Sequence, residues 1–283
     1  MIDFIKGRII SNPALAETLR NGICERVDIN HKTAETDTAI FRGKIGDFEI
    51  LVYSSNLIRV KGSIHKYYEG GTNSSDFTYS MFLKTVNRFC GELGIKPIDF
   101  LLENVEFGVN ILLPYSAKII LDNVVCLKTG LPFSHQQGGG LCFKRKEYRH
   151  KLYDKSAQYQ LTGFLLRYEI HADKMRLITP VKTLHDLTIP EVWTMFQQEL
   201  CRYFQEIIFT DTYTPEKLKK WNKKYYKQYA DKINNSRFWK GLAGIDRYRH
   251  HLRLKRLQQQ GTHNFSIEIV KLIEKKAVEL KSR

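Results

Sequence analysis

The sequence predicts an α+β fold, with a central antiparallel β-sheet, flanking helices and a helical, basic C-terminal region. Up to about residue 180, short segments alternate apolar and polar residues with a period of two, which is typical of strands that bury one face. After Pro190 the apolar spacing becomes helical. We therefore expect an α+β domain over residues 1–189 and a helical region over residues 190–283.

The expected strands share period-two alternation and are separated by turn residues such as Ser54, Ser55 and Asn56. They cover residues 39–42, 48–53, 57–67, 105–113, 141–144, 149–153 and 164–172. One helix interrupts them. Asp76 or Thr78 can cap its start, and Gly94 ends it after Leu93.

The C-terminal region is expected to be entirely helical. Pro190 and Pro215 stand where a first-turn proline is tolerated, and Gly261 is a natural helix terminator. The expected helices cover residues 190–209, 215–229, 235–242, 245–260 and 266–280.

Charge is unevenly distributed along the chain. The chain holds 45 Lys and Arg against 30 Asp and Glu, a net charge of +15, and residues 215–283 hold 19 of the former and 6 of the latter, a net +13. This excess predicts a polyanionic partner for the C-terminal region and argues against a sugar or small-molecule enzyme. A hydrophobic content of 42% argues against a mainly disordered chain.

Neither membrane nor disulfide signals are found in the sequence. No apolar run approaches the roughly 18 residues that span a bilayer, and the first residues lack the pattern of a signal peptide. The five cysteines are scattered and never in a Cys-x-x-Cys spacing, so we expect ordinary thiols rather than disulfides or a zinc site. These observations predict a cytoplasmic protein with no membrane partner.

Residues 149–155 form a candidate nucleophile strand. Alternation places Arg149, Lys151, Tyr153 and Lys155 on one face, so that three cations surround one phenol. Adjacent positive charge favours the phenolate, which would prepare Tyr153 to attack a phosphodiester. A solvated basic edge strand is the alternative. Tyr148 is the rival nucleophile, but alternation places it on the opposite face.

Carboxylates and an imidazole line a second expected strand. Glu169 and His171 share one face of 164–172, and this pairing suits a divalent cation. Glu106 can supply another carboxylate from the strand 105–113, where Gly108 leaves room beside it. The alternative is a half-buried sheet whose polar side faces water.

Two further segments combine basic and aromatic residues. Residues 61–73 can hold phosphates and stack bases, or form a plain hairpin loop. In 245–257, an apolar stripe of Ile245, Tyr248 and Leu252 is flanked by arginines that suit phosphates, with a solvated basic helix as the alternative. Residues 217–227, with Trp221, add lysines and stacking surfaces.

The order of these pieces resembles one family of replication proteins. Ser-Ile-His-Lys-Tyr over 63–67 is followed by Val-Glu-Phe-Gly-Val-Asn over 105–110, Leu-Tyr-Asp-Lys over 152–155 and Leu-Arg-Tyr-Glu-Ile over 166–170. This order resembles the rolling-circle replication initiators of the filamentous-phage gene II type and their plasmid and integrative-element relatives. The resemblance covers roughly residues 45–190. The chain lacks the His-hydrophobic-His strand and the Tyr-x-x-Lys helix of better-known tyrosine nickases.

The resemblance implies a role for individual residues. Tyr153 matches the nucleophile and Lys155 its charged neighbour, while Glu106 and Glu169 match acidic positions near the metal; geometry adds His171 and His65 as ligand candidates. The expected metal is Mg²⁺ or Mn²⁺. The candidate DNA-binding residues are Lys66, Asn73, Arg149, Lys151, Arg167, Arg249, Arg253 and Arg256.

The implied activity is metal-dependent nicking of one DNA strand at an origin. Tyr153 would form a 5′-phosphotyrosine link and release a 3′-OH, and strands would later be rejoined. The implied partners are duplex and single-stranded origin DNA and a host helicase and polymerase in bacterial cytoplasm; the oligomeric state, a homodimer included, stays open. Two alternatives stay open as well: a non-catalytic DNA-binding replication regulator, and an RNA-binding or RNA-processing protein.

Overall fold

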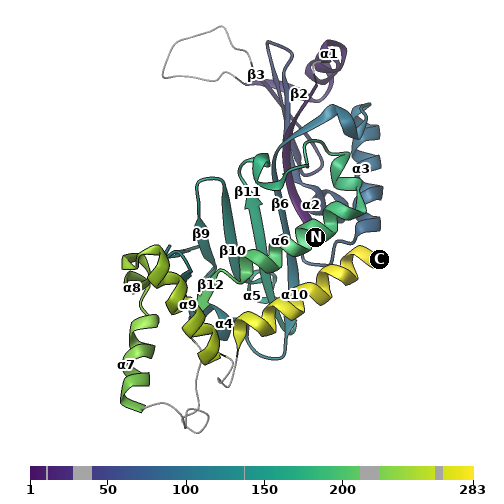
Figure 1. Cartoon of the computed structure of the whole chain (residues 1–283). Helices are drawn as coiled ribbons and strands as arrows, with labels where there is room; N and C mark the ends of the chain where they lie inside the picture. The colour runs from purple at the N-terminus through teal and green to yellow at the C-terminus, as the bar shows by residue number, and fades with distance from the viewer. Residues whose placement is uncertain (11, 28–39, 137, 211–222, 259–263) are drawn as a thin grey trace.

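A computed structural model describes the chain except for residues 11, 28–39, 137, 211–222 and 259–263. Its centre is a ten-stranded sheet in which every paired strand is antiparallel (Figure 1). The strands follow in the order β2 (Cys24–Val27), β3 (Ile40–Ile45), β4 (Phe48–Tyr53), β5 (Ile58–Ser63), β1 (Ile2–Ile9), β6 (Phe100–Leu113), β11 (Phe164–Ala172), β10 (Tyr148–Asp154), β9 (Leu141–Lys144) and β8 (Ser134–His135). A separate two-stranded sheet pairs β7 (Val124–Leu127) with β12 (Ile207–Phe209). The predicted α+β class is confirmed.

Helices complete the fold. The α-helices are α1 (Pro13–Gly22), α2 (Ile64–Glu69), α3 (Tyr79–Leu93), α4 (Ala117–Asp122), α5 (Lys155–Tyr159), α6 (Pro190–Phe204), α7 (Lys223–Ile233), α8 (Ser236–Gly241), α9 (Gly244–Gln258) and α10 (Phe265–Ser282). Three short 3-10 helices are η1 (Pro97–Asp99), η2 (Met175–Ile178) and η3 (Asp186–Thr188). Among the described residues, no helix combines the length and apolar character needed to cross a membrane.

The hydrophobic core lies between the large sheet and the helices α3, α6 and α10. The Phe107 ring of β6 stacks on Phe196 of α6 with centroids 4.2 Å apart, and Phe82 of α3 contacts Trp193 of α6. In Figure 1, α6 and α10 cross the same side of the sheet. Residues of α6 and α10 belong to the same hydrophobic core as the strands of the large sheet. The change of sequence pattern at residue 190 therefore does not coincide with a boundary between two separate cores.

A smaller apolar cluster fixes the helices α7 to α9. It joins Cys126 and Ile208 of the small sheet to Trp239 of α8 and Leu254 of α9. Gly130 packs directly against this unit, because a Cβ there would lie 2.3 Å from the backbone nitrogen of Lys240. The basic helices are thus packed against the body of the protein. All five cysteines are free and buried, as expected.

Several element boundaries differ from the sequence-based expectation. The predicted strand 57–67 ends at Ser63, whose hydroxyl caps α2 by accepting from the Lys66 amide at 3.1 Å. The predicted helix 190–209 ends at Phe204, and residues 207–209 form β12. The strand β1 and the helix α1 were not predicted. The cap Thr78 and the terminator Gly94 of α3 are confirmed.

Candidate active site on the polar face of the sheet

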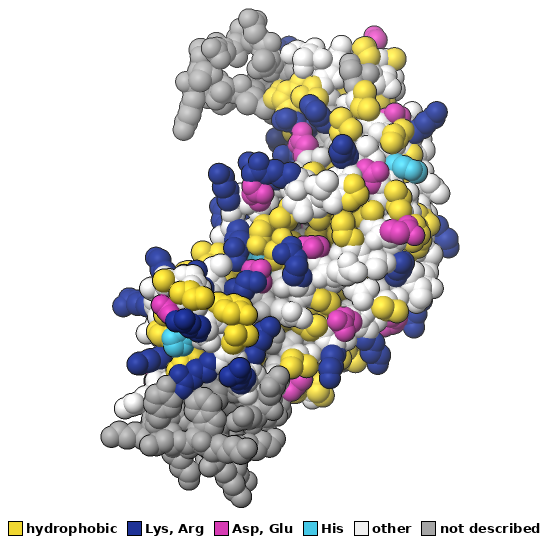
Figure 2. Space-filling view, viewed as in Figure 1, with side chains coloured by type: hydrophobic (Ala, Val, Ile, Leu, Met, Phe, Trp, Pro, Cys, Tyr) yellow, Lys and Arg dark blue, Asp and Glu magenta, His cyan; other side chains and the backbone are white. Residues whose placement is uncertain are grey.

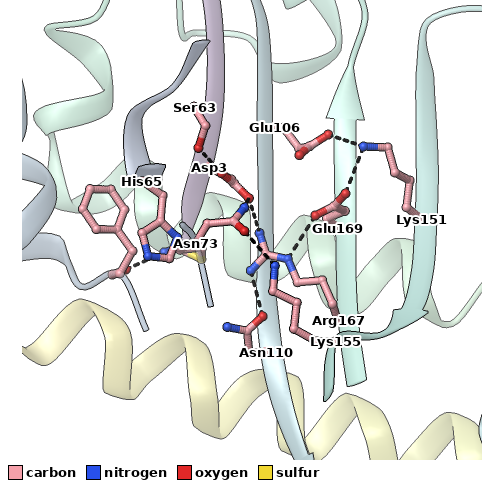
Figure 3. A network of polar contacts seen from close by, with 12 residues as sticks. Asp3, Ser63, His65, Asn73, Glu106, Asn110, Lys151, Lys155, Arg167 and Glu169 are labelled. Carbon is pink, nitrogen blue, oxygen red and sulfur yellow. Dashed lines mark hydrogen bonds and ion pairs between the residues drawn. The ribbon is translucent and has the colours of Figure 1, made fainter. Parts of the chain in front are cut away.

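Three carboxylates from three neighbouring strands converge on the face of the sheet opposite the core. They are Asp3 of β1, Glu106 of β6 and Glu169 of β11, all buried, with ligand oxygens within 4.8 Å of one another. Figure 3 shows them side by side with their partners. We call these three residues the carboxylate cluster. It is the one group of three or more potential metal ligands among the residues that the structure describes.

The backbone explains how the cluster forms. The register of β1 against β6 shifts between Ile2 and Phe4, so Asp3 lies at a bulge, where a side chain is redirected. Glu169 lies opposite Gly108 in the β11–β6 pairing. A Cβ at Gly108 would lie 2.5 Å from the Cβ of Glu169, so the space that glycine leaves belongs to Glu169 rather than to Glu106 as predicted.

Two cations bridge the carboxylates. The Nζ of Lys151 donates to Glu106 at 2.6 Å and to Glu169 at 2.9 Å, and Arg167 donates to Glu169 at 3.0 Å and to Asp3 at 3.3 Å. Burial alone would lower the pKa of Lys151, but the charges of Glu169 and Glu106 outweigh it and raise this pKa. Burial would raise the pKa of Glu169, but Lys151 and Arg167 outweigh it and lower that pKa. Lys151 and Arg167 therefore favour the ionised form of Glu169, and the cluster is paired with cations of the protein itself.

Tyr153 lies beside the cluster, as predicted from strand alternation. Its hydroxyl donates to Oε2 of Glu169 at 3.4 Å. The expectation that nearby cations favour the phenolate is wrong for this structure, because Lys151 is bound to carboxylates and Arg149 is paired with Asp173 at 2.8 Å. Burial, and then the charge of Glu169, raises the pKa of Tyr153. The phenol is thus held neutral beside a carboxylate acceptor.

Lys155 is placed by a helix rather than by the strand. The strand β10 ends at Asp154, whose side chain caps α5 by accepting from the Ala157 amide at 2.9 Å. The buried Nζ of Lys155 donates to Oδ1 of Asn73 at 3.0 Å and lies 5.7 Å from the centre of the Tyr153 ring. Burial, and then the charge of Arg167, lowers the pKa of Lys155 to about 8.

Asn73 connects Lys155 to the carboxylate cluster. Its Nδ2 donates to Oδ2 of Asp3 at 2.7 Å, and Ser63 donates to Oδ1 of the same carboxylate at 2.6 Å. Tyr159 also donates to Asn73, at 2.6 Å, so a second phenol lies close to the cluster. Asn73 was predicted to bind DNA, but its polar atoms are bonded inside the protein.

The two predicted histidine ligands lie outside the carboxylate cluster. His171 contacts Glu106 at 3.1 Å through Nδ1. The buried His65 stacks on Phe77 at 4.7 Å, with Nε2 3.1 Å from Glu69. Burial, and then the charge of Arg167, lowers the pKa of His65 to about 2.

The predicted DNA-binding residues lie in two places, on the large sheet with its adjoining helix α2 and on α9. On the sheet, Arg167 is buried, and Lys151 and Arg149 are paired with carboxylates. Lys66 is half-buried on α2. On α9, Arg249 pairs with Asp246 at 3.4 Å, Arg253 lies over the Tyr229 ring and Arg256 is exposed. Trp221 and the lysines of 217–222 lie outside the described residues.

Tyr148 lies on the opposite face of β10, as predicted. It is buried in the core, and its ring contacts that of Tyr203 at 4.7 Å. Burial raises the pKa of its phenol. It does not reach the carboxylate cluster.

A cavity of about 410 Å³ opens beside Tyr153. Gly140 allows its wall to approach, because a Cβ there would lie 2.9 Å from the Cβ of Tyr153. The lining residues are Gln136, Gly138, Gly140, Leu141, Lys151, Tyr153, Asp154, Ala157, Gln158 and Glu169. A substrate in this cavity would meet Tyr153, Lys151 and Glu169 together.

Two residues of the site were missed by sequence reasoning. Asp3 lies at a bulge in β1 that results from a register shift against β6. The sequence of β1 alone does not indicate this shift in register. Tyr159 lies six residues after Tyr153, and only the α5 turn brings it back to Asn73. Asn110 of β6 also contacts this network, because its Oδ1 accepts from Arg167 at 3.2 Å.

Comparisons with known proteins give likenesses to solved structures only. No protein-family model matches the chain, and no curated protein matches it. Five solved chains match. One is the structure of a rolling circle replication initiator protein from Geobacillus stearothermophilus, with 13% identity and a TM-score of 0.40, covering 83% of this chain and 96% of that one. This likeness is too distant to carry an activity from that protein to this chain.

Proposed function

We propose that this chain is a rolling-circle replication initiator, a metal-dependent endonuclease and strand transferase that nicks one DNA strand through Tyr153. The observation that supports this most is the position of the Tyr153 hydroxyl. It lies 3.4 Å from Glu169, at the border between the carboxylate cluster and the cavity of about 410 Å³. A nucleophile, a proton acceptor and space for a substrate therefore meet at one place.

The donor set suits a divalent cation. Three carboxylates offer the hard oxygen ligands that Mg²⁺ and Mn²⁺ take, and Asp3, Glu106 and Glu169 would hold the ion. The ammonium of Lys151 lies between Glu106 and Glu169, where it already offsets part of their charge. When bound, the cation would stabilise charge on the scissile phosphate and lower the pKa of the nearby phenol.

The protein's own residues would carry the transfer. The oxygen of Tyr153 forms a bond to phosphorus while the bond from phosphorus to the 3′ oxygen breaks. Glu169 takes the phenolic proton, and the ammonium of Lys155 donates a proton to the departing 3′ oxygen. The products are a 5′-phosphotyrosine and a free 3′-OH. Attack by a 3′-OH reverses these steps and rejoins the strand without an external energy source.

A basic groove at the far end of β10 supports DNA as the substrate. The groove, of about 610 Å³, is lined by the exposed Lys144, Lys146 and Lys240, and also by Arg145 and Glu147. Tyr148 borders it, five residues before Tyr153, or about 17 Å along an extended strand. Tyr148 lies on the face of β10 opposite Tyr153, so the groove's cations would bind a stretch of phosphate backbone away from the nucleophile.

The experiment is a nicking assay on supercoiled plasmid that carries the DNA flanking the gene, with Mg²⁺ or Mn²⁺. We expect nicked circles and a protein–DNA adduct on denaturing gels. Tyr153→Phe should form neither, while the matched control Tyr148→Phe should form both. An adduct with Tyr153→Phe would reject the nucleophile.

The same assay separates the alternatives. Binding of the plasmid without any metal-dependent nicking would favour a non-catalytic DNA-binding regulator. Stronger competition by single-stranded RNA than by single-stranded DNA of the same sequence would favour an RNA-binding protein.

A further inference from the structure

The helix α9 exposes large apolar side chains. Ile245, Tyr248 and Leu252 have exposed fractions of 60%, 61% and 40%, and their spacing places them on one face. The sequence predicted this stripe, but the buried side of α9 is carried instead by Leu254, which is 2% exposed. Adjacent exposed apolar groups on a folded surface often mark a binding site.

The helix is held in a defined orientation. The Tyr229 hydroxyl of α7 lies 3.1 Å from Nδ1 of His250, and the two rings stack at 5.6 Å. Arg247 donates to the carbonyl oxygen of Leu242 at 2.7 Å, which fixes the connection from α8. Leu254 belongs to the cluster that joins α9 to the small sheet. The exposed stripe is thus presented on a packed support.

The charge of α9 indicates the class of partner. The helix contains five basic residues, Arg247, Arg249, Arg253, Lys255 and Arg256, and one acidic residue, Asp246. Arg256 is exposed and lies four residues after Leu252, next to it on the helix surface. Figure 2 shows hydrophobic side chains beside Lys and Arg over the part of the surface where α8 and α9 lie. An uncharged protein surface would meet the apolar stripe alone, whereas the basic residues beside it favour a polyanion.

A DNA major groove offers both features. It is about 12 Å wide and admits a helix of about 10–12 Å diameter, and it displays the C5-methyl group of thymine between phosphate rows. The short α8 precedes α9 by two residues, an order found where a second helix enters the groove and the first lies across the backbone.

We propose that α9 enters the major groove of duplex DNA and reads its sequence through apolar contacts. Ile245, Tyr248 and Leu252 would contact thymine methyl groups, and Arg249 and Arg256 would bind the flanking phosphates or guanine edges. The inference rests on the proposed function in taking DNA as the partner. It identifies α9 as the helix that selects the DNA sequence, and it does not depend on the nicking chemistry.

The test begins with selection of duplexes from a library with 20 random base pairs, using the full chain. Each thymine of the selected duplex is then replaced by deoxyuridine, which removes only the methyl group. We expect about a four-fold loss of affinity at each contacted thymine, the equivalent of one buried methyl group. Leu252→Ala should lose sensitivity at one of these positions, while the control Val278→Ala, an exposed residue of α10, should keep it.

Three results would overturn the inference: no enriched sequence, no effect of deoxyuridine, or unchanged thymine dependence in Leu252→Ala. Equal competition by duplex RNA would also overturn it, because the major groove of RNA is too narrow for a helix. Nicking of a single-stranded oligonucleotide is measured separately and should be unchanged in the control Val278→Ala. A chain that nicks without selecting duplexes contradicts this inference alone, and one that selects without nicking contradicts the proposed function alone.

Discussion

The carboxylate cluster and the helix α9 handle charge in opposite ways. Glu169 and Arg167 are 2% and 5% exposed, and each forms an ion pair with an oppositely charged residue of the protein. On α9, Arg256 is exposed and stands beside exposed apolar groups. Paired buried charges hold groups in fixed positions, which suits chemistry, whereas exposed cations retain their attraction for an external polyanion.

This difference separates two tasks in the proposed initiator. Changes in the cluster should alter cleavage and folding while leaving duplex affinity nearly unchanged. Changes on the basic surfaces should alter affinity and its salt dependence while leaving cleavage of short single strands intact. Single and combined substitutions in the two regions test that separation.

Glu169→Gln should have the largest effect on activity. The amide keeps the shape of the side chain but removes the negative charge that would hold the metal and accept the Tyr153 proton. We expect nicking to fall by at least about 10³-fold with duplex affinity unchanged. The control is Glu103→Gln, also on β6, where Glu103 pairs with the half-buried Lys6 and Arg59 at 3.6 and 3.5 Å, away from the cluster. Full nicking by Glu169→Gln would exclude its proposed role.

Arg167→Met should have the largest effect on stability. Removing the buried guanidinium leaves Asp3 and Glu169 with less compensation, which costs about 3 kcal/mol of unfolding free energy. The measurement is urea denaturation. The control Arg149→Met breaks a part-exposed pair with Asp173 and should cost at most about 1 kcal/mol. Equal losses for both variants would contradict the internal pairing of the cluster.

Ionisation of Lys155 should make the nicking rate fall at alkaline pH. Its pKa is lowered to about 8, so the ammonium that donates to the 3′ oxygen is lost above that pH and the rate should fall there. Lys155→Arg keeps a cation that does not titrate in this range, and its nicking rate should not show this fall. If the nicking rate of Lys155→Arg falls with the same midpoint pH as that of the native chain, the fall is caused by another group.

The lowered pKa of Lys155 also makes the stability of the protein depend on pH. Below pH 8, Lys155 is protonated in both the folded and the unfolded chain, so the cost of burying its charge is fully present. As the pH rises from 8 towards the ordinary value of 10.5, the folded state releases the proton first and this cost fades. Lys155→Met should therefore gain stability relative to the native chain most clearly below pH 8.

Replacing Lys144, Lys146 and Lys240 together with Gln should have the smallest effect, confined to binding. Each phosphate contact that is lost should reduce the slope of log affinity against log salt by about 0.9. The control replaces three exposed lysines elsewhere, Lys84, Lys96 and Lys182, by Gln. Equal slopes in the two triple variants would show that the groove does not bind phosphates.

Part of the site could be predicted from the sequence because strand alternation is a local property. The period of two correctly placed Lys151 and Tyr153 on one face of β10, Glu169 on that face of β11, and Tyr148 on the other. These assignments need no knowledge of which strands are neighbours.

The rest of the site depends on long-range pairing. The bulge at Asp3 arises from the register of β1 against β6, and the bridging role of Lys151 depends on Glu106 lying two strands away. Lys151 was correctly placed on the face of Tyr153, but the carboxylates that surround the phenol could not be identified from one strand, so the predicted direction of its pKa shift was wrong. Lys155 moved into a helix because Asp154 acts as its cap.

The role of Tyr153 as nucleophile is tested most directly by identifying the residue that becomes covalently attached to DNA. The native chain is incubated with cleavable single-stranded DNA and Mg²⁺ or Mn²⁺, the adduct is digested with nuclease and protease, and the modified peptide is sequenced by mass spectrometry. We expect a nucleotide joined through a 5′ phosphate to Tyr153. Attachment to Tyr159 or Tyr148, or through a 3′ phosphate, would contradict this role.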